Sequence, residues 1–344
     1  MMKIISNFRI IVISAYLVPI LSLQKLQGQY SILFDGNDDF IEVGASSDYD
    51  FSDEDAFSLS FWVNFSNVSS TQYIFSAEDM FWVYLDGTST GEIHFRYRNH
   101  PTGNWPDEYS SFSPQIGYWY HIIITTANGA TKIYVNGSLD EESTTAITGL
   151  TGNGSNSRDL ELGARQAYSN TTVSFLNGYL DEIAMWNEAI TADEISYINQ
   201  KGIQLDLSSD AGDYNSSSNL VCYWRLNESI GSSTLDSSPN SNNGTIEGSA
   251  SYSSAVPTLQ ILGSAGFRIL STPVSNGTYT DLLAELWTQG MTGSDAAEAS
   301  ADNVWDFTLG SSAAGTWSVV SNLGNTMDAG EGFLVYVYSD NDYD

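Results

Sequence analysis

Hydrophobic and polar residues alternate in many short segments of the first half of the chain. Residues 57–65, FSLSFWVNF, place apolar side chains on one face of a strand, at Phe57, Leu59, Phe61, Val63 and Phe65. Similar segments continue to residue 164, and Asp-Gly or Asn-Gly turns lie between them at 86–87, 128–129 and 136–137. The pattern predicts an all-β domain built as a sandwich or a barrel of antiparallel strands.

Residues 178–186, GYLDEIAMW, are typical of one more strand, and the sequence after them predicts a short helix. Thr191 suits the N-cap position, and Glu194 three residues later completes a capping box. Glu194 and its neighbour Asp193 also favour the positive end of the helix dipole. The local helix start therefore explains this second pair of acids.

The strand at 178–186 contains a first pair of acids, Asp181 and Glu182. Strict alternation predicts that Asp181 faces the same side as Ile183, and that Glu182 faces the opposite side with Leu180. Two carboxylates on opposite faces cannot act together on one bond. The strand is therefore expected to carry no pair of catalytic acids.

The two ends of the chain differ from its middle. An apolar run with basic residues before it, too short for a membrane span, is typical of a signal peptide. After Pro257 a second β-rich region begins, and the chain is expected to be incomplete at its C-terminus. The predicted organisation is a signal peptide at 1–28, a β domain at 29–257 and a smaller β-rich module at 258–344.

Charge limits the possible partners. The chain has 42 acidic and 11 basic residues, with a net charge of −31. Such a surface repels nucleic acids and anionic membranes, so neither is an expected partner, and no membrane insertion is expected after signal cleavage. The lone cysteine, Cys222, lies in an apolar segment and is interpreted as a small buried residue.

Four segments resemble, in order, the laminin G-like, concanavalin A-like jelly rolls of the bacterial LamG type, which are related to pentraxins. They are SILFDGNDDFIEV at 31–43, FSLSFWVNF at 57–65, WYHIIITTANGATKIYVNGSL at 119–139 and GYLDEIAMWNEAITADEI at 178–195. The segment with Trp224, Asp236 and Gly244 resembles one often found beside such domains. The region from residue 263 resembles a module of secreted Bacteroidetes proteins.

The resemblance implies a two-sheet antiparallel jelly-roll sandwich with one short capped helix, export from the cell, and binding of glycans or proteins, often with one calcium ion. Laminarinase-type glycosidases of the same fold carry a Glu-x-Asp-x-x-Glu strand, which this chain lacks. Retaining glycosidases hold their two carboxyl groups about 5–5.5 Å apart. We therefore expect a protein that is not an enzyme.

A calcium site is one interpretation of the turn in FDGNDDF. Asp35, Asn37, Asp38 and Asp39 offer oxygen atoms close together, and the resemblance implies that Asp181 of the closing strand could complete the shell. The alternative is a polar hairpin turn whose side chains bond their own backbone.

A ligand site is predicted around the long loop at 99–114. Trp105 and Tyr109 of this loop, with Tyr97 of the preceding strand, are the candidate residues, because aromatic rings stack on sugars. The alternative is that Trp105 covers a sheet edge. Two function classes follow: a secreted or cell-surface adhesion module that binds glycan or extracellular matrix-type ligands, or a structural or targeting domain of a larger surface protein or glycan-degrading enzyme.

Overall fold

The chain divides into two compact units, Met1–Thr258 and Leu259–Asp344. The computed structural model describes residues 29–49, 51, 56–77, 80–87, 91–98, 103–127, 129–143, 159–167, 171–257, 266–271, 277–283, 291–292, 294, 303–309, 315–327 and 332–337. The signal peptide predicted at 1–28 lies outside these residues.

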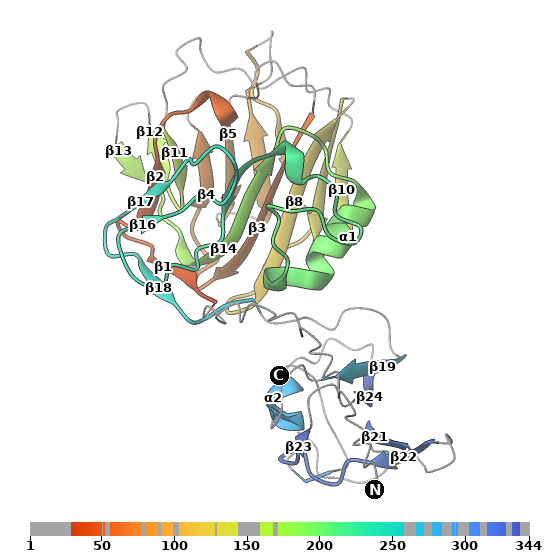
Figure 1. The fold of residues 1–344 in the computed structure, drawn as a ribbon. Helices are drawn as coiled ribbons and strands as arrows, with labels where there is room; N and C mark the ends of the chain where they lie inside the picture. Colours follow the sequence, from red (N-terminus) through yellow and green to blue (C-terminus); the bar gives the residue numbers. More distant parts are fainter. Residues whose placement is uncertain are drawn as a thin grey trace, which may run out of the picture. The chain divides into compact units, whose positions relative to one another are not determined.

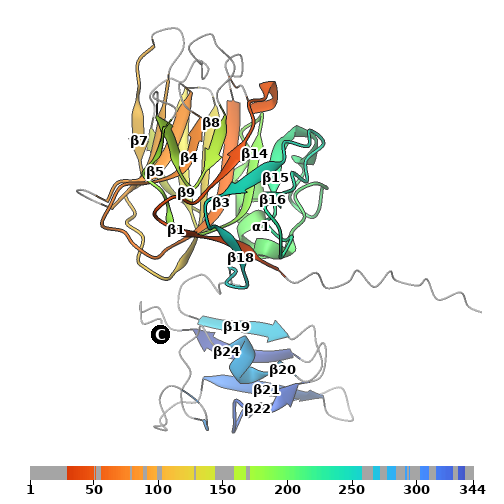
Figure 2. The ribbon, with the colours of Figure 1, turned by 90° about the vertical axis from the view of Figure 1, so that its left-hand side faces the viewer.

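The first unit is a sandwich of two antiparallel sheets, as the sequence predicts (Figures 1 and 2). The first sheet runs in the order β10 (Ser138–Ser143), β9 (Ala130–Val135), β8 (Trp119–Ala127), β3 (Ala56–Phe65), β14 (Asn177–Trp186), β1 (Ser31–Asp35) and β18 (Ser251–Ser253). A further strand, β15 (Leu220–Trp224), pairs with the second half of β14, beyond the end of β1.

The second sheet also has eight strands. Its order is β16 (Ser233–Thr234), β17 (Gly244–Glu247), β2 (Phe40–Val43), β11 (Leu160–Leu162), β4 (Gln72–Ala77), β5 (Phe81–Leu85), β6 (Ile93–Tyr97) and β7 (Asp107–Tyr109). A separate hairpin of β12 (Arg165–Ala167) and β13 (Thr171–Val173) follows β11. Strands β7 and β16 therefore form the two edges of this sheet.

The inner faces of the two sheets enclose the main hydrophobic core. The alternation predicted for β3 is confirmed, since its apolar set lies in this core: Phe57, Leu59, Phe61, Val63 and Phe65. The second sheet contributes the inward residues of β5, which are Phe81, Val83 and Leu85. Burial of these large side chains is the main driving force for packing the sheets together.

The helix α1 (Ala192–Lys201) covers the outer face of the first sheet (Figure 1). Its predicted capping box is confirmed. The Thr191 N–H donates to Glu194 Oε2 at 2.8 Å, and the Glu194 N–H donates to Thr191 Oγ1 at 3.3 Å. Ile195 and Ile198 of the helix pack in a second core with Trp186 of β14.

The segment after α1 connects the two sheets. It passes through the 3₁₀ turns Gly202–Gln204 and Ser217–Asn219, and then adds β15 and β18 to the first sheet and β16 and β17 to the second. The carboxylate of Asp236 accepts backbone N–H bonds from Tyr223, Ser238 and Asn242 at 2.8 Å each. A buried carboxylate with these partners fixes a region that has little regular structure.

The second unit has its own small core, which contains Val304, Phe333 and Val335. Its main sheet has the order β19 (Gly266–Ser271), β24 (Gly332–Val337), β21 (Val304–Leu309) and β22 (Gly315–Val319). A second pair joins β20 (Gly277–Thr278) and β23 (Thr326–Met327), and α2 (Tyr279–Leu282) follows β20. A 3₁₀ turn of the first unit, Ser47–Tyr49, completes the regular elements among the described residues.

Candidate functional site

The hairpin between β1 and β2 brings three carboxylates together. Ligand atoms of Asp35, Asp38 and Asp39 lie within 4.8 Å of one another. The Asp39 carboxylate accepts the Asp35 N–H at 2.8 Å and the Ser249 N–H at 2.5 Å, so it ties the hairpin to the turn before β18. Asn37 donates its backbone N–H and its side-chain amide to Asp35, at 2.8 and 3.0 Å. These bonds lower the pKa of Asp35.

Asp181 does not belong to this group, so its assignment to the metal shell was wrong. In the β1–β14 ladder Asp35 lies opposite Asn177, and Asp181 comes four residues later on β14. A strand rises about 3.4 Å per residue, which separates the two positions by about 13 Å along the sheet. Among the described residues, the hairpin therefore offers carboxylates from Asp35, Asp38 and Asp39 only.

Strand β14 contains a bulge that contradicts the predicted alternation. The register with β3 shifts between Asp181 and Ala184, and Glu182 has a φ of 44°. Leu180 and Ile183 both point into the main core, so the two acids between them share the outer face. The prediction that Asp181 and Glu182 face opposite sides was wrong, because the extra residue of a bulge breaks the two-residue period.

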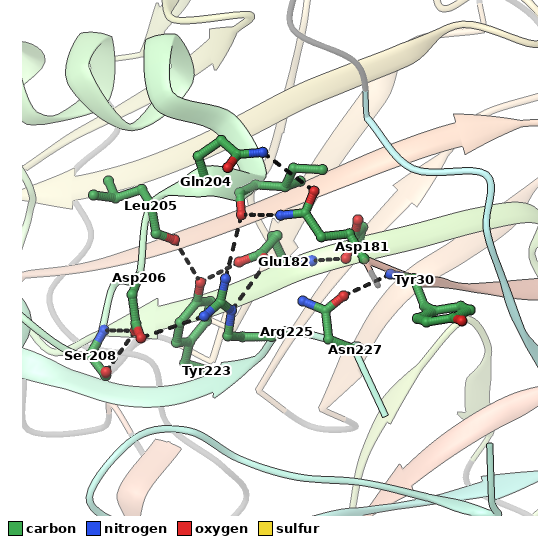
Figure 3. Close-up of polar contacts among 12 residues, drawn as sticks. Tyr30, Asp181, Glu182, Gln204, Leu205, Asp206, Ser208, Tyr223, Arg225 and Asn227 are labelled. Atoms are coloured by element: carbon green, nitrogen blue, oxygen red, sulfur yellow. Dashed lines mark hydrogen bonds and ion pairs between the residues drawn. The ribbon is translucent and has the colours of Figure 1, made fainter. Parts of the chain in front are cut away.

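The two acids form a buried polar cluster under the 3₁₀ turn that follows α1 (Figure 3). Glu182 accepts hydrogen bonds from the Tyr223 hydroxyl and, at 3.4 Å, from Arg225 Nε. The Asp181 carboxylate accepts the Glu182 N–H at 2.9 Å. Arg225 also lies 3.5 Å from Asp206. The cluster therefore connects β14, β15 and the segment after α1.

Burial controls the charge of this cluster. Asp181 is 1% exposed and Glu182 is 5% exposed. Burial raises the pKa of Glu182 to about 7, although Arg225 opposes the shift. Burial and the neighbouring Glu182 raise the pKa of Asp181 as well. These carboxyl groups are closed to solvent and bonded to protein groups, which suits an anchor between strands better than a reaction centre.

The outer face of the second sheet carries a continuous group of aromatic side chains, here called the aromatic face. It consists of Tyr73, Trp82, Tyr84, His94, Trp105 and Tyr109. Phe81, Val83 and Leu85 of β5 point into the core, so Trp82 and Tyr84 of the same strand point outward. The same alternation on β6 turns His94 and Arg96 outward.

The rings of the aromatic face contact one another in series. Trp105 stacks on Trp82 with centroids 4.6 Å apart and planes 8° apart. Trp82 meets Tyr73 edge-on at 6.3 Å, and Tyr73 stacks on Tyr84 at 5.1 Å. His94 then lies 4.9 Å from Tyr84 and 5.4 Å from Tyr109. The series runs from the partly exposed Trp105 to the exposed Tyr109; between them Trp82 and Tyr73 are buried, and Tyr84 and His94 are half-buried.

Polar groups accompany these rings. The Asp107 carboxylate accepts the Tyr84 hydroxyl at 2.9 Å and contacts His94 Nδ1 at 3.1 Å. Burial and this carboxylate raise the pKa of Tyr84, so its hydroxyl remains a donor. The guanidinium carbons of Arg165 and Arg96 lie 4.2 and 5.7 Å from the Trp82 ring centroid. The aromatic face thus combines flat apolar surfaces with charged hydrogen-bonding groups.

The structure separates the three predicted ligand residues. Trp105 packs on Trp82 and Tyr109 is 54% exposed, so both belong to the aromatic face. Tyr97 is 0% exposed and lies in the main core against Phe95, so its assignment to a ligand surface was wrong. Tyr97 follows the inward register of its strand. The same alternation was the available signal for Trp82, Tyr84 and His94, which the sequence reasoning missed.

His121 and Cys222 are both buried, which suits a structural role for each. His121 is buried, stacks on Trp62 at 4.7 Å and contacts Ser60 Oγ at 2.9 Å through Nε2. Burial lowers its pKa to about 4, so the ring is neutral at pH 7. Cys222 is buried, as predicted, and burial raises the pKa of its thiol.

The two packed sheets and the capped helix define a two-sheet jelly-roll domain. Residues 35–196 match the laminin G-type family described as Concanavalin A-like lectin/glucanases superfamily. The match lies within the first unit, whose two antiparallel sheets have the concanavalin A-like jelly-roll architecture that the sequence resemblance implies.

Individual proteins resemble parts of this chain. A human Adhesion G-protein coupled receptor D1 is 34% identical over 90 residues, which are 25% of this chain and 10% of that receptor. A protein from Bacteroides ovatus ATCC 8483, described as carbohydrate binding, superposes with a TM-score of 0.52 at 19% identity, over 68% of this chain and 63% of its own. This similarity shows the shared fold.

A heptameric SAP-like pentraxin from Limulus polyphemus superposes with a TM-score of 0.42 at 14% identity, over 68% of this chain and 98% of its own.

In the part of the chain that the structure describes, no helix is both long and apolar enough to span a membrane.

Proposed function

We propose that the first unit is a secreted or cell-surface module that binds a glycan on its aromatic face and carries out no catalysis. The observation that carries the proposal is the stacked ring series that ends in Trp105 and Tyr109, on an outer sheet face. Flat aromatic rings beside hydrogen-bonding groups suit the apolar faces and hydroxyls of sugars. The carbohydrate-binding description of the Bacteroides ovatus protein supports the same ligand class.

The edge strand β7 arranges the exposed groups of the aromatic face along one line. Asp107 and Tyr109 belong to β7, and the Tyr97 N–H donates to the Pro106 carbonyl at 3.2 Å, so the pairing with β6 extends toward Trp105. Trp105, Asp107 and Tyr109 therefore lie on one face, spaced by two residues. The two rings are about 13 Å apart along an extended strand, with a carboxylate between them. This span suits a ligand of more than one sugar ring.

The test is a glycan array with the mature protein and two variants, Trp105→Ala and Tyr109→Ala. We expect binding to fall by about tenfold or more in each variant, because each loses a stacking surface. Tyr118→Ala is the matched control, since Tyr118 is a 40% exposed tyrosine outside the ring series. Binding that survives both substitutions would exclude this surface. A protein that binds no glycan at all would favour the structural or targeting role.

The absence of catalysis rests on the surroundings of the acids. Glu182 and Asp181 share one face, so the bulge allows them to be close, but both are buried and bonded within the cluster. A substrate would have to displace Tyr223 or Arg225 to reach Glu182. We therefore propose that the pair has a structural role.

We further propose that the β1–β2 hairpin binds a calcium ion through Asp35, Asp38 and Asp39. Calcium prefers oxygen ligands, and carboxylates with main-chain carbonyls and water complete its shell. The three carboxylates fit this chemistry, since their oxygens lie within 4.8 Å of one another and two of the side chains are exposed. Asn37 belongs to the turn through its bonds to Asp35, so we assign it no direct metal contact.

A further inference from the structure

Three hydroxyl groups lie inside the sandwich, at one end of the main core. Tyr97 is the last residue of β6 in the second sheet, and Thr126 and Thr131 are paired across β8 and β9 in the first. The three side chains are 0%, 1% and 1% exposed. None of their hydroxyl oxygens has a hydrogen-bond partner within the described part of the chain. Buried polar atoms are rarely left unpaired, so a partner other than a protein side chain is expected here.

The alternation of each strand directs these side chains into the space between the sheets. On β8, Thr126 follows Ile124 of the main core in the two-residue period, and on β9 Thr131 precedes Ile133 in the same way. Tyr97 is itself a member of the main core. The first sheet therefore changes from isoleucine to the smaller and polar threonine at the end of the core that Tyr97 faces.

The hydroxyls of Tyr97 and Thr131 are neighbours. Burial raises the pKa of Tyr97 and the carboxylate of Glu108 adds to the rise, whereas the Thr131 side chain opposes it. The phenol therefore keeps its proton at neutral pH and can donate it to an acceptor. Thr131 is near enough to influence Tyr97, but the two oxygens do not have the geometry of a hydrogen bond. A direct bond between them would also leave the Thr126 hydroxyl without a partner.

A water molecule suits this group of hydroxyls better than an ion does. Each hydroxyl can donate one bond and accept others, and none of them is charged at pH 7. A buried water typically makes about three hydrogen bonds to protein groups that lack other partners. A calcium ion would instead require about six to eight oxygen ligands, including carboxylates, and Glu108 is the one carboxylate that acts on Tyr97.

We propose that Tyr97, Thr126 and Thr131 bind a buried water molecule that bridges the two sheets. The site does not depend on the glycan binding proposed above. It lies where β6 ends, and the Tyr97 N–H donates to the carbonyl of Pro106, next to Trp105. The water thus links the first sheet to the strand that leads to Trp105, and it gives the buried hydroxyl of Tyr97 a structural role.

The experiment counts the water molecules that are held inside the full mature chain, by magnetic relaxation dispersion of water oxygen-17. The test variant combines Tyr97→Phe, Thr126→Val and Thr131→Val, which remove the three hydroxyls with little change of shape. We expect this variant to hold at least one water fewer than the wild type. Thr125→Val is the matched control, because Thr125 lies next to Thr126 on β8 and faces the opposite side. It should keep the wild-type number.

The melting temperature gives a second readout that needs one substitution only. With a bound water, Thr131→Val should lower the melting temperature more than Thr125→Val does, because the water and the other hydroxyls lose a partner. With unpaired hydroxyls, the same substitution should raise it, because an unsatisfied buried polar group is removed. Such a rise would overturn the proposal, and so would equal numbers of held waters in the wild type and the triple variant. If the triple variant does not fold, Tyr97→Phe and Thr131→Val are measured singly by relaxation, with the same expectation.

Discussion

A carboxyl group that is buried in the protein loses its charge more readily than one in water, and Glu182 is in this position. Its pKa is raised to about 7 by burial, although Arg225 lies 3.4 Å away. A folded-state pKa above the unfolded value means that the folded protein holds more protons in that pH range. The cluster thus contributes most to stability below the unfolded pKa of about 4.5, and this contribution is lost as pH rises through 7.

The prediction at this scale concerns Glu182→Gln. Between pH 5 and pH 8 the melting temperature of the wild type should fall more than that of the variant, because the variant has no side chain to ionise at residue 182. Thermal melting across this range measures the difference. Glu228→Gln is a control, since this residue lies in a separate polar group around Tyr252. If the melting temperatures of the wild type and of Glu182→Gln changed in parallel with pH, the proposed effect of Glu182 ionisation on stability would be wrong.

At the scale of single elements, the prediction concerns calcium binding by the β1–β2 hairpin, and thermal melting tests it. Calcium should raise the melting temperature of the wild type, and a chelator should lower it, because an ion bound only by the folded state stabilises that state. Asp38→Asn should abolish the response. Asp213→Asn, in another exposed turn, should leave it intact. A wild-type melting temperature that is the same with calcium and with chelator would rule out the site.

The elements also show what the sequence can and cannot predict. The helix α1 and its cap follow from Thr191 and Glu194, because capping depends on residues within one turn. The bulge in β14 also has a local signal, since Leu180 and Ile183 are both apolar with two acids between them, which strict alternation does not allow. The assumption that side chains alternate strictly along β14, with no bulge, placed Glu182 on the wrong face of the strand.

The aromatic face was only partly predictable for a different reason. Outward positions on one strand can be assigned from alternation, and Tyr97 should have been placed inside by that rule. The stack of Trp105 on Trp82 depends on the register between separate strands and on a loop that returns over the sheet. Register across a sheet is set by tertiary packing, and a single sequence does not specify it.

At the scale of the whole molecule, the chain combines two units with separate cores. The first unit buries its own apolar residues between its two sheets and under α1, and the core of the second unit is built from residues after 258. The segment after α1 is part of the first unit, because β15 and β18 complete one sheet and β16 and β17 extend the other. A unit with a complete core of this size is expected to fold by itself.

The last prediction is that residues 29–258 fold and bind without the second unit. The isolated unit should melt cooperatively, within a few degrees of the corresponding transition of residues 29–344, because its two hydrophobic cores are built from its own residues. It should also give the same pattern on the glycan array, because Trp105 and Tyr109 both belong to it. A folded unit that has lost sugar binding would show that residues after 258 contribute to the ligand site. An unfolded one would show that its core is not sufficient.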